Sequence, residues 1–107
     1  MTKKFHLALS VQNLESCVLD FTQRFGCEPC VVVEGEYALW RTAFLNVSIR
    51  CDACSAAGTL RHLGWEDDSV QAFTTETDVN GVVWERFTAQ QQAHEINSLW
   101  PGAGYRP

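Results

Sequence analysis

The sequence predicts an α+β fold in a single domain covering residues 1–107. Segments in which apolar and polar residues alternate indicate strands on both sides of a segment with helical spacing, and a second helical segment closes the chain. A chain of 107 residues is long enough for one domain and too short for two ordinary ones. With 46% hydrophobic residues and four tryptophans, the chain can bury a core without help from disulfides or a metal.

Residues 5–51 predict a strand, a helix and three further strands. The first strand has two unlike faces, with Phe5, Leu7, Leu9 and Val11 on one and His6, Ala8 and Ser10 on the other. We expect the apolar face to be buried under the helix, so that His6 points to the opposite side. Asn13 is a candidate N-cap for that helix, which runs to about Phe25 before Gly26 ends it. Strand-like runs follow at residues 29–34, 37–42 and 44–51.

The second half predicts fewer strands and a closing helix. Residues 52–59 form an irregular connector, and residues 60–66 alternate again. Residues 69–75 fit either a short helix or a loop. An Asn-Gly turn at residues 78–81 precedes a β-branched and aromatic strand at residues 82–87. Thr88 and Gln91 have the spacing of a capping box, and the apolar stripe of the helix behind them extends to Trp100.

Charge and composition exclude several classes of partner. The formal net charge is −5 and the eight Lys and Arg form no basic cluster, so we expect no binding to nucleic acid. No apolar run reaches the roughly 20 residues that cross a bilayer, and the start of the chain has no signal-peptide pattern. We therefore expect a cytoplasmic protein that does not contact membranes. The five cysteines should then be free thiols.

Two Cys-x-x-Cys pairs, Cys27 with Cys30 and Cys51 with Cys54, have the spacing of a four-thiolate zinc site. If the three runs at residues 29–51 form an antiparallel meander, the pairs lie at opposite ends of the sheet, roughly 20 Å apart. Sulfurs that share one zinc ion lie within about 4 Å of each other. Free thiols are therefore the favoured interpretation, and a four-cysteine zinc module with an interaction role is kept as an alternative.

Three polar residues on otherwise apolar strands suggest a different metal site. His6, His62 and Glu85 come from three separate segments. Two imidazoles and one carboxylate bind a divalent first-row metal while leaving coordination positions open for substrate or water. The simpler interpretation of each residue is a hydrogen-bonded strand side chain.

The segment "FHLALSVQNLESCVLDFTQRFGCEP", followed by "YALWRTAFLNVSIR", resembles the opening βαβββ module of the vicinal oxygen chelate superfamily, which contains glyoxalases, bleomycin-resistance proteins and extradiol dioxygenases. In that family two modules pair into a cup, and a divalent metal is held by a His from the first strand of each module and a Glu from the last strand of the second. His6 matches the first position, His62 in "LRHLGWE" resembles the second, and Glu85 in "NGVVWERF" is similar to the third.

The chain departs from the family pattern in two respects. Its second half has room for only one or two strands after His62, so the resemblance implies a βαβββ module, a shortened second module and a C-terminal helix, with the mixed sheet curved into a cup. Asn46 or Ser48 replaces the carboxylate that some members supply as a fourth ligand. The shortened module leaves strand edges and apolar surface to cover, so we expect a homodimer.

The function expected from these residues is that of a small metal-dependent enzyme acting on an oxygen-rich small molecule, with lyase, isomerase or dioxygenase chemistry. Glu85 and Arg50 are the candidate catalytic residues, Arg50 as an anion clamp and otherwise an ordinary surface arginine. Glu66, on the His62 face, is a candidate general base or a solvated carboxylate. The alternative is a metal-free protein that binds an aromatic or antibiotic-like compound in a cup lined by Tyr37, Trp40 and Trp84.

Overall fold

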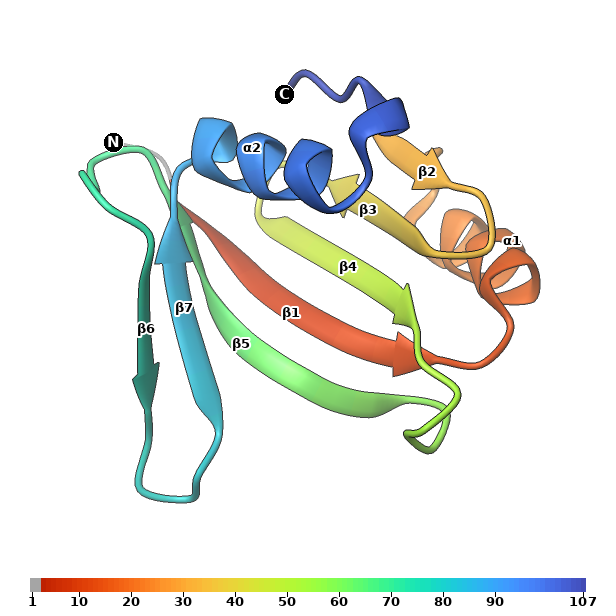
Figure 1. Cartoon of the computed structure of the whole chain (residues 1–107), viewed down its shortest axis with the longest axis horizontal. Coiled ribbons are helices and arrows are strands. Elements are labelled where there is room, and N and C mark those ends of the chain that lie inside the picture. The colour runs from red at the N-terminus through yellow and green to blue at the C-terminus, as the bar shows by residue number, and fades with distance from the viewer. Residues whose placement is uncertain (1–2) are drawn as a thin grey trace.

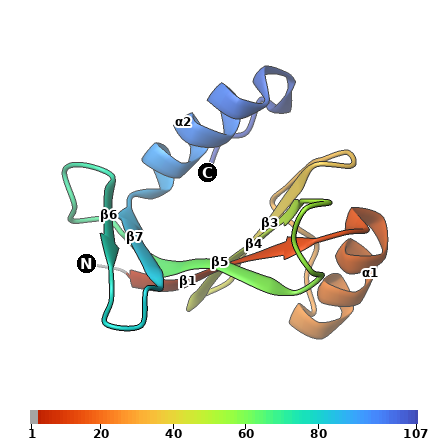
Figure 2. The same ribbon diagram turned by 60° about the horizontal axis from the view of Figure 1, so that its bottom comes forward.

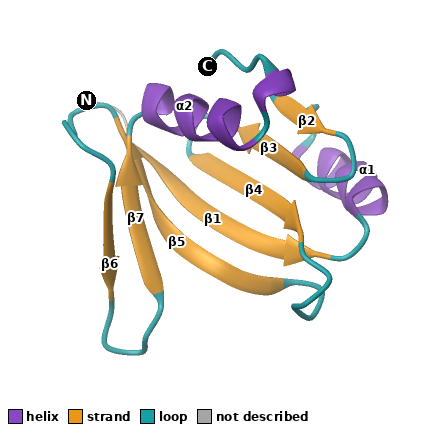
Figure 3. Ribbon diagram, viewed as in Figure 1, coloured by secondary structure: helices purple, strands orange, loops and turns teal. Residues whose placement is uncertain are grey.

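The computed structural model describes residues 3–107 and shows one seven-stranded mixed sheet with two α-helices (Figures 1 and 3). The elements are β1 (Lys3–Val11), α1 (Leu14–Phe25), β2 (Val31–Val33), β3 (Tyr37–Arg41), β4 (Leu45–Cys51), β5 (Thr59–Asp67), β6 (Thr74–Thr77), β7 (Val83–Phe87), α2 (Ala89–Leu99) and a 3-10 turn, η1 (Pro101–Ala103). The α+β class and the C-terminal helix are confirmed. Within the described residues, no helix is both long and apolar enough to cross a lipid bilayer.

The strand order is β2-β3-β4-β1-β5-β7-β6. β1 runs parallel to β4, β5 runs parallel to β7, and β6 is antiparallel to β7 as β3 is to β4. The order and directions of β5, β7 and β6 therefore repeat those of β1, β4 and β3. β1 and β5 pair antiparallel at the centre, where Leu7 lies opposite Leu63. This pairing gives His6 and His62 equivalent positions, each one residue before the central leucine.

The ends of both α-helices follow the local sequence signals. The Asn13 side chain accepts a hydrogen bond from the Ser16 backbone N–H, and Gly26 ends α1 in the left-handed conformation at φ 70°. Thr88 and Gln91 form the expected capping box at the start of α2. The predicted ends at Asn13, Gly26 and Thr88 are confirmed. They could be predicted because a helix cap depends on residues close together in the chain.

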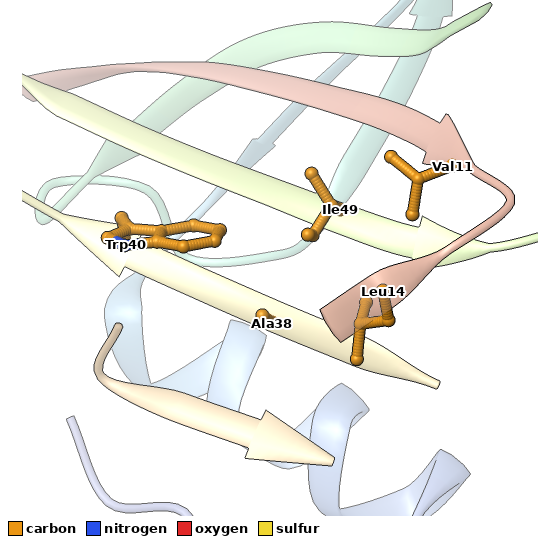
Figure 4. Packing of buried hydrophobic residues seen from close by; sticks show 5 residues of the cluster. All are labelled: Val11, Leu14, Ala38, Trp40 and Ile49. Atoms are coloured by element: carbon orange, nitrogen blue, oxygen red, sulfur yellow. The ribbon is translucent and has the colours of Figure 1, made fainter. Parts of the chain in front are cut away.

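Helix α1 packs on one face of β1, β3 and β4. Figure 4 shows the buried residues of this contact: Val11, Leu14, Ala38, Trp40 and Ile49. Phe21 and Phe25 of the helix each lie 5.7 Å from the Trp40 ring, measured between centroids. This cluster is the core on the outer side of the sheet.

Helix α2 covers the opposite face. Ala93 and Ile96 pack with Tyr37, Leu39 and Tyr105 in a second buried cluster. Figure 2 shows the two helices on opposite sides of the β3–β4 part of the sheet. The space between α2 and the sheet is where the site described below lies.

The two faces of β1 are buried differently from the prediction. His6, Ala8 and Ser10 are only 2%, 0% and 2% exposed, whereas Phe5 and Leu7 are half-buried. The expectation that the apolar face would be the buried one was wrong for this half of the strand. Helix α1 contacts mainly β3 and β4 and reaches β1 near Leu9 and Val11, so nothing equivalent covers Phe5 and Leu7.

Two of the three aromatic residues expected to line a binding cup face away from it. Trp40 is fully buried under α1. Trp84 precedes Glu85 on β7 and contacts Phe5, with ring centroids 6.2 Å apart on the outer face. Alternation along a strand gives neighbouring residues opposite directions, so Trp84 and Glu85 cannot share a face. Only Tyr37 lies on the side that α2 covers.

Residues 69–75, for which helix and loop were both open, include the start of the edge strand β6. All four residues of β6 are exposed. Their sequence, Thr-Thr-Glu-Thr, has no apolar alternation that could have indicated a strand.

Candidate metal centre

The side chains of His6, His62 and Glu85 converge on one point although they come from β1, β5 and β7. The two histidine Nε2 atoms are 3.0 Å apart, and His62 Nε2 lies 3.0 Å from Glu85 Oε1. The ligand atoms of all three residues lie within 4.8 Å of one another. Across residues 3–107, no other group of three or more His, Cys, Asp and Glu side chains comes together in this way.

The strand register brings the three residues together. His6 lies opposite Gly64 in the β1–β5 pair, and Gly64 lies opposite Glu85 in the β5–β7 pair. His62 is two residues before Gly64 and therefore projects from the same face. A Cβ atom at position 64 would lie 2.1 Å from the Glu85 carbonyl oxygen. Gly64 thus permits the close approach of β7 that places Glu85 beside the histidines.

Two of the distances between these atoms are close to those of ligands to a shared ion. Two donor atoms bonded to one tetrahedral ion at zinc–nitrogen distances are about 3.3 Å apart. The observed 3.0 Å between the two Nε2 atoms is close to this value. A single proton on His62 Nε2 could be donated to only one of its two neighbours, His6 or Glu85, whereas a cation between them would satisfy all three atoms.

Asn46 fixes which nitrogen of His6 faces the centre. Asn46 Nδ2 donates hydrogen bonds to Glu66 Oε1 at 2.8 Å and to Gln92 Oε1 at 2.7 Å, so the amide orientation is determined by its acceptors. Asn46 Oδ1 then accepts from His6 Nδ1 at 2.8 Å. Because Nδ1 carries the proton, Nε2 presents its lone pair to the centre, as a metal ligand requires.

Glu66 anchors Asn46 and is itself held by Arg41. Arg41 donates from Nε and Nη2 to the two Glu66 oxygens at 2.8 and 2.9 Å. Burial alone would raise the pKa of Glu66, but the hydrogen bonds from Arg41 and Asn46 outweigh it and lower the pKa. With both oxygens engaged, Glu66 has a supporting position and does not project toward the histidines as a general base.

His6 is neutral at physiological pH. Burial, followed by the nearby His62, lowers the pKa of His6 to about 4, against the opposing effect of the hydrogen bonds that His6 donates to Asn46. A neutral imidazole is the form that binds metal. The buried surroundings of His6 thus keep its ligand atom available over most of the pH range in which the protein would work.

The register also decides between the two candidates for a fourth ligand. Ala8 and Gly64 are equivalent positions, each two residues after the histidine of its strand. Glu85 lies opposite Gly64 in the β5–β7 pair, and Ser48 lies opposite Ala8 in the β1–β4 pair. Ser48 therefore holds the position that is equivalent to Glu85. Asn46 is instead the partner of His6. Ser48 is 3% exposed and offers a hydroxyl in place of a carboxylate. The set of ionisable ligands therefore stays at three.

A cavity of about 110 Å³ lies between the centre and α2. Its wall includes Tyr37, Ser48, Phe73, Phe87, Ile96 and Trp100, together with the three ligand residues. Arg50, for which an anion clamp and an ordinary surface arginine were both open, lines this cavity with its guanidinium 5.3 Å from the centroid of the Trp100 ring. Open coordination positions of a bound ion would face this space.

Three residues of the site were missed from the sequence. Gln92 of α2 braces Asn46, and Trp100 contributes an aromatic wall, but nothing local places the C-terminal helix over β4. Arg61 also lines the cavity, although simple alternation would point it away from His62. Trp100 was placed on the apolar stripe of the last helix but not at a site, and no sequence signal distinguishes Gln92 and Arg61 from surface side chains.

The four cysteines of the two Cys-x-x-Cys pairs do not assemble. Cys30 adjoins β2 at the sheet edge, and Cys51 ends β4, two strands away. All five cysteines are free thiols, and they form no ligand group within residues 3–107. The meander that separates them is the one that the sequence predicted.

Searches of protein-family models and of curated proteins find no match to this chain. The functional interpretation therefore depends on the geometry of the site.

Proposed function

We propose that this protein is a metal-dependent enzyme of the vicinal oxygen chelate type that acts on an oxygen-rich small molecule. The observation that carries the proposal is the convergence of His6, His62 and Glu85, with Asn46 holding His6 in the ligand tautomer. Two imidazoles and one carboxylate suit a divalent first-row ion with open coordination positions. The support of His6 by Asn46, Glu66 and Arg41 resembles the outer hydrogen bonds that orient metal ligands in general.

A divalent ion held by these residues would supply a Lewis acid for two neighbouring substrate oxygens. It would stabilise negative charge that develops on those oxygens during lyase, isomerase or dioxygenase chemistry. Glu85 offsets part of the charge of the ion and Arg50 faces the same cavity, so these two residues are the ones we assign to catalysis. The buried side chains of Phe87 and Ile96, with the partly buried Phe73, form an apolar wall that limits access of water.

The fold is consistent with two modules that share one cup-shaped sheet. We infer that β1 to β4 with α1 form a complete βαβββ module and that β5 to β7 form a shortened one. The repeated order and directions of β1-β4-β3 and β5-β7-β6 support this inference. The second module has no helix between β5 and β6, and α2 covers the inner face.

We also propose a homodimer. The missing helix of the second module leaves Phe5, Leu63, Trp65 and Trp84 only partly buried on the outer face. A hollow of about 480 Å³ lies on this face beside Trp65 and Trp84. A second copy of the chain would bury these side chains in a two-fold contact.

A metal-free binding protein is the second candidate. The Tyr37 and Trp100 rings lie 4.9 Å apart between centroids at the cavity wall, which would suit a small aromatic ligand. Such a protein would contain no stoichiometric metal after purification.

Metal analysis of the purified protein tests the proposal. We expect about one divalent ion per chain, lost in His6→Ala and Glu85→Gln and retained in Cys27→Ser. Because Glu85→Gln conserves size, its loss of metal would report on the carboxylate and not on packing. Loss of the metal in Cys27→Ser, with the metal retained in His6→Ala, would support the four-cysteine alternative. Absence of metal from the folded wild-type protein would reject the metal-dependent enzyme and support the metal-free binding protein.

A further inference from the structure

Two arginines line the cavity in front of the proposed metal centre. Arg50 projects from β4 and Arg61 from β5. Within residues 3–107, neither guanidinium lies in an ion pair with a carboxylate, whereas Arg24, Arg41 and Arg86 each do. Arginine is charged at all physiological pH values, so the cavity wall carries two positive charges without direct counter-ions.

A bulge in β5 directs Arg61 into the cavity. Ala8 of β1 lies opposite His62, but the next residue of β1, Leu9, lies opposite Leu60. Arg61 is thus the extra residue, without a partner across the strand pair. A bulge disturbs the alternation of side chains and can re-aim one of them, which explains how Arg61 lines the same cavity as its neighbour His62.

The Arg50 guanidinium is held against an aromatic ring although it lies near the like charge of Arg61. Arg50 stacks over Trp100 at 5.3 Å from the ring centroid. Burial, and then the proximity of Arg50, lower the pKa of Arg61, which shows that its charge is partly desolvated beside a like charge. An oxyanion between them would offset both effects.

The charges of the wall favour an anionic ligand once a metal is bound. The nearby carboxylates are Glu85, a proposed ligand of the metal, and Glu95, an exposed residue of α2. These two carboxylates balance Arg50 and Arg61, so a divalent ion leaves the site with two excess positive charges. A ligand with two negative charges would neutralise it, and a ligand with one would offset half of the excess.

We propose that the substrate is a small organic anion in which one oxygen-bearing group chelates the metal while a second, anionic oxygen group is clamped by Arg50 and Arg61. This inference rests on the proposed function, because the metal supplies the first anchor. The cavity of about 110 Å³ is well below the 300–1,000 Å³ of sites for drug-sized ligands, so the ligand is a compact acid.

The clamp is tested by calorimetric titration of the Zn²⁺-loaded protein with L-malate and L-lactate. Both acids carry the same hydroxycarboxylate group for the metal, and only malate has a second carboxylate. We expect malate to bind about tenfold or more tightly than lactate, and Arg50→Gln or Arg61→Gln to remove that advantage while leaving lactate affinity within about twofold. Arg24→Gln, on the exposed side of α1, is the matched control and should leave both affinities unchanged.

Metal affinity measured in the same variants separates this inference from the proposed function. Removing a nearby positive charge should leave Zn²⁺ affinity unchanged or slightly higher in Arg61→Gln, whereas His62→Ala should lose the metal. Equal affinities for the two acids, or no binding of malate, in a protein that retains Zn²⁺ would overturn the clamp and leave the metal centre intact. If the protein binds no Zn²⁺, the proposed function fails, and malate binding that depends on Arg50 and Arg61 would support the clamp alone.

Discussion

At the scale of single residues, the site depends on a chain of contacts that gives each polar group one role. Arg41 holds Glu66, Glu66 accepts from Asn46, and Asn46 accepts from His6. The contact with Glu66 fixes the orientation of the Asn46 amide, and the contact with Asn46 fixes the tautomer of His6. In the proposed metal site, His6 would therefore be oriented by residues that do not contact the metal.

Asn46 should act as a positioning residue. Asn46→Ala removes the closer of the two acceptors of His6 Nδ1, the side-chain oxygen at 2.8 Å, and a donor to Glu66, while the backbone carbonyl at 3.1 Å stays. We therefore expect metal affinity to fall about 10-fold while the fold is kept. Metal competition with a chromophoric chelator measures this change. Asn80→Ala, at an exposed turn, is the control and should have no effect. Unchanged metal affinity in folded Asn46→Ala would show that the His6 tautomer is fixed by other means.

His6 should make the metal-free protein sensitive to acid. Its pKa is about 4 in the folded state and about 6.5 when unfolded, so the unfolded chain binds the proton first as pH falls. The free energy of unfolding is unaffected by His6 well above pH 6.5 and is about 3 kcal/mol lower at pH 4. Urea unfolding in the presence of a chelator measures this loss.

His6→Gln is the comparison for the acid effect because glutamine does not titrate. As pH falls from 7 to 4, the free energy of unfolding of the wild type should decrease by about 3 kcal/mol more than that of His6→Gln. A constant difference across that range would mean that His6 titrates normally in the folded protein.

At the scale of elements, the contact between β5 and β7 determines the position of Glu85. Gly64 is the one residue whose lack of a side chain permits this contact, since a Cβ would meet the Glu85 carbonyl oxygen. The bulge at Arg61 makes β5 irregular on one side of His62, whereas its register with β1 is regular from His62 to Asp67. His62 thus lies between a bulge and a glycine, each of which affects how side chains reach the site.

Gly64→Ala should damage both stability and metal binding. The clash is with backbone, which cannot rotate away, so we expect a loss of about 1–3 kcal/mol in unfolding free energy and weaker metal binding as Glu85 shifts. Gly102→Ala is a matched control, because a Cβ there meets nothing within 4 Å and the backbone does not have positive φ. Equal stability of the two variants would mean that β7 can move apart from β5 without cost.

At the scale of the whole molecule, the two halves of the sheet are covered unequally. Helix α1 buries the outer face of the first half, and no helix does so for β5, β6 and β7. The turn between β5 and β6 is too short to supply one. The exposed edge of β6 carries only threonine and glutamate, which limits pairing along that edge and favours contact through the outer face.

We expect a dimer of about twice the 12.0 kDa chain mass in sedimentation equilibrium. Trp84→Lys should shift the equilibrium to monomer, because it places a charge in the proposed contact, while Val79→Lys at a fully exposed turn should not. Circular dichroism confirms that Trp84→Lys remains folded. A wild-type protein that sediments as a monomer at all concentrations would reject the dimer.

The sequence by itself determined most of the elements and the identity of the three candidate ligands. Caps at Asn13 and Thr88 and the left-handed stop at Gly26 were predictable because each depends on neighbours within a few residues. Alternation placed His6 on the face away from α1. The family resemblance, and not any spacing rule, joined it to His62 and Glu85.

Only the tertiary structure decided that these ligands meet, that Asn46 and Gln92 support them, and that Arg61 faces the same cavity. These features depend on which distant strands pair, on a bulge that breaks alternation, and on where α2 lies. Which distant strands pair depends on the free energies of all the packing arrangements that the chain can adopt. A local pattern of residues therefore does not predict the pairing.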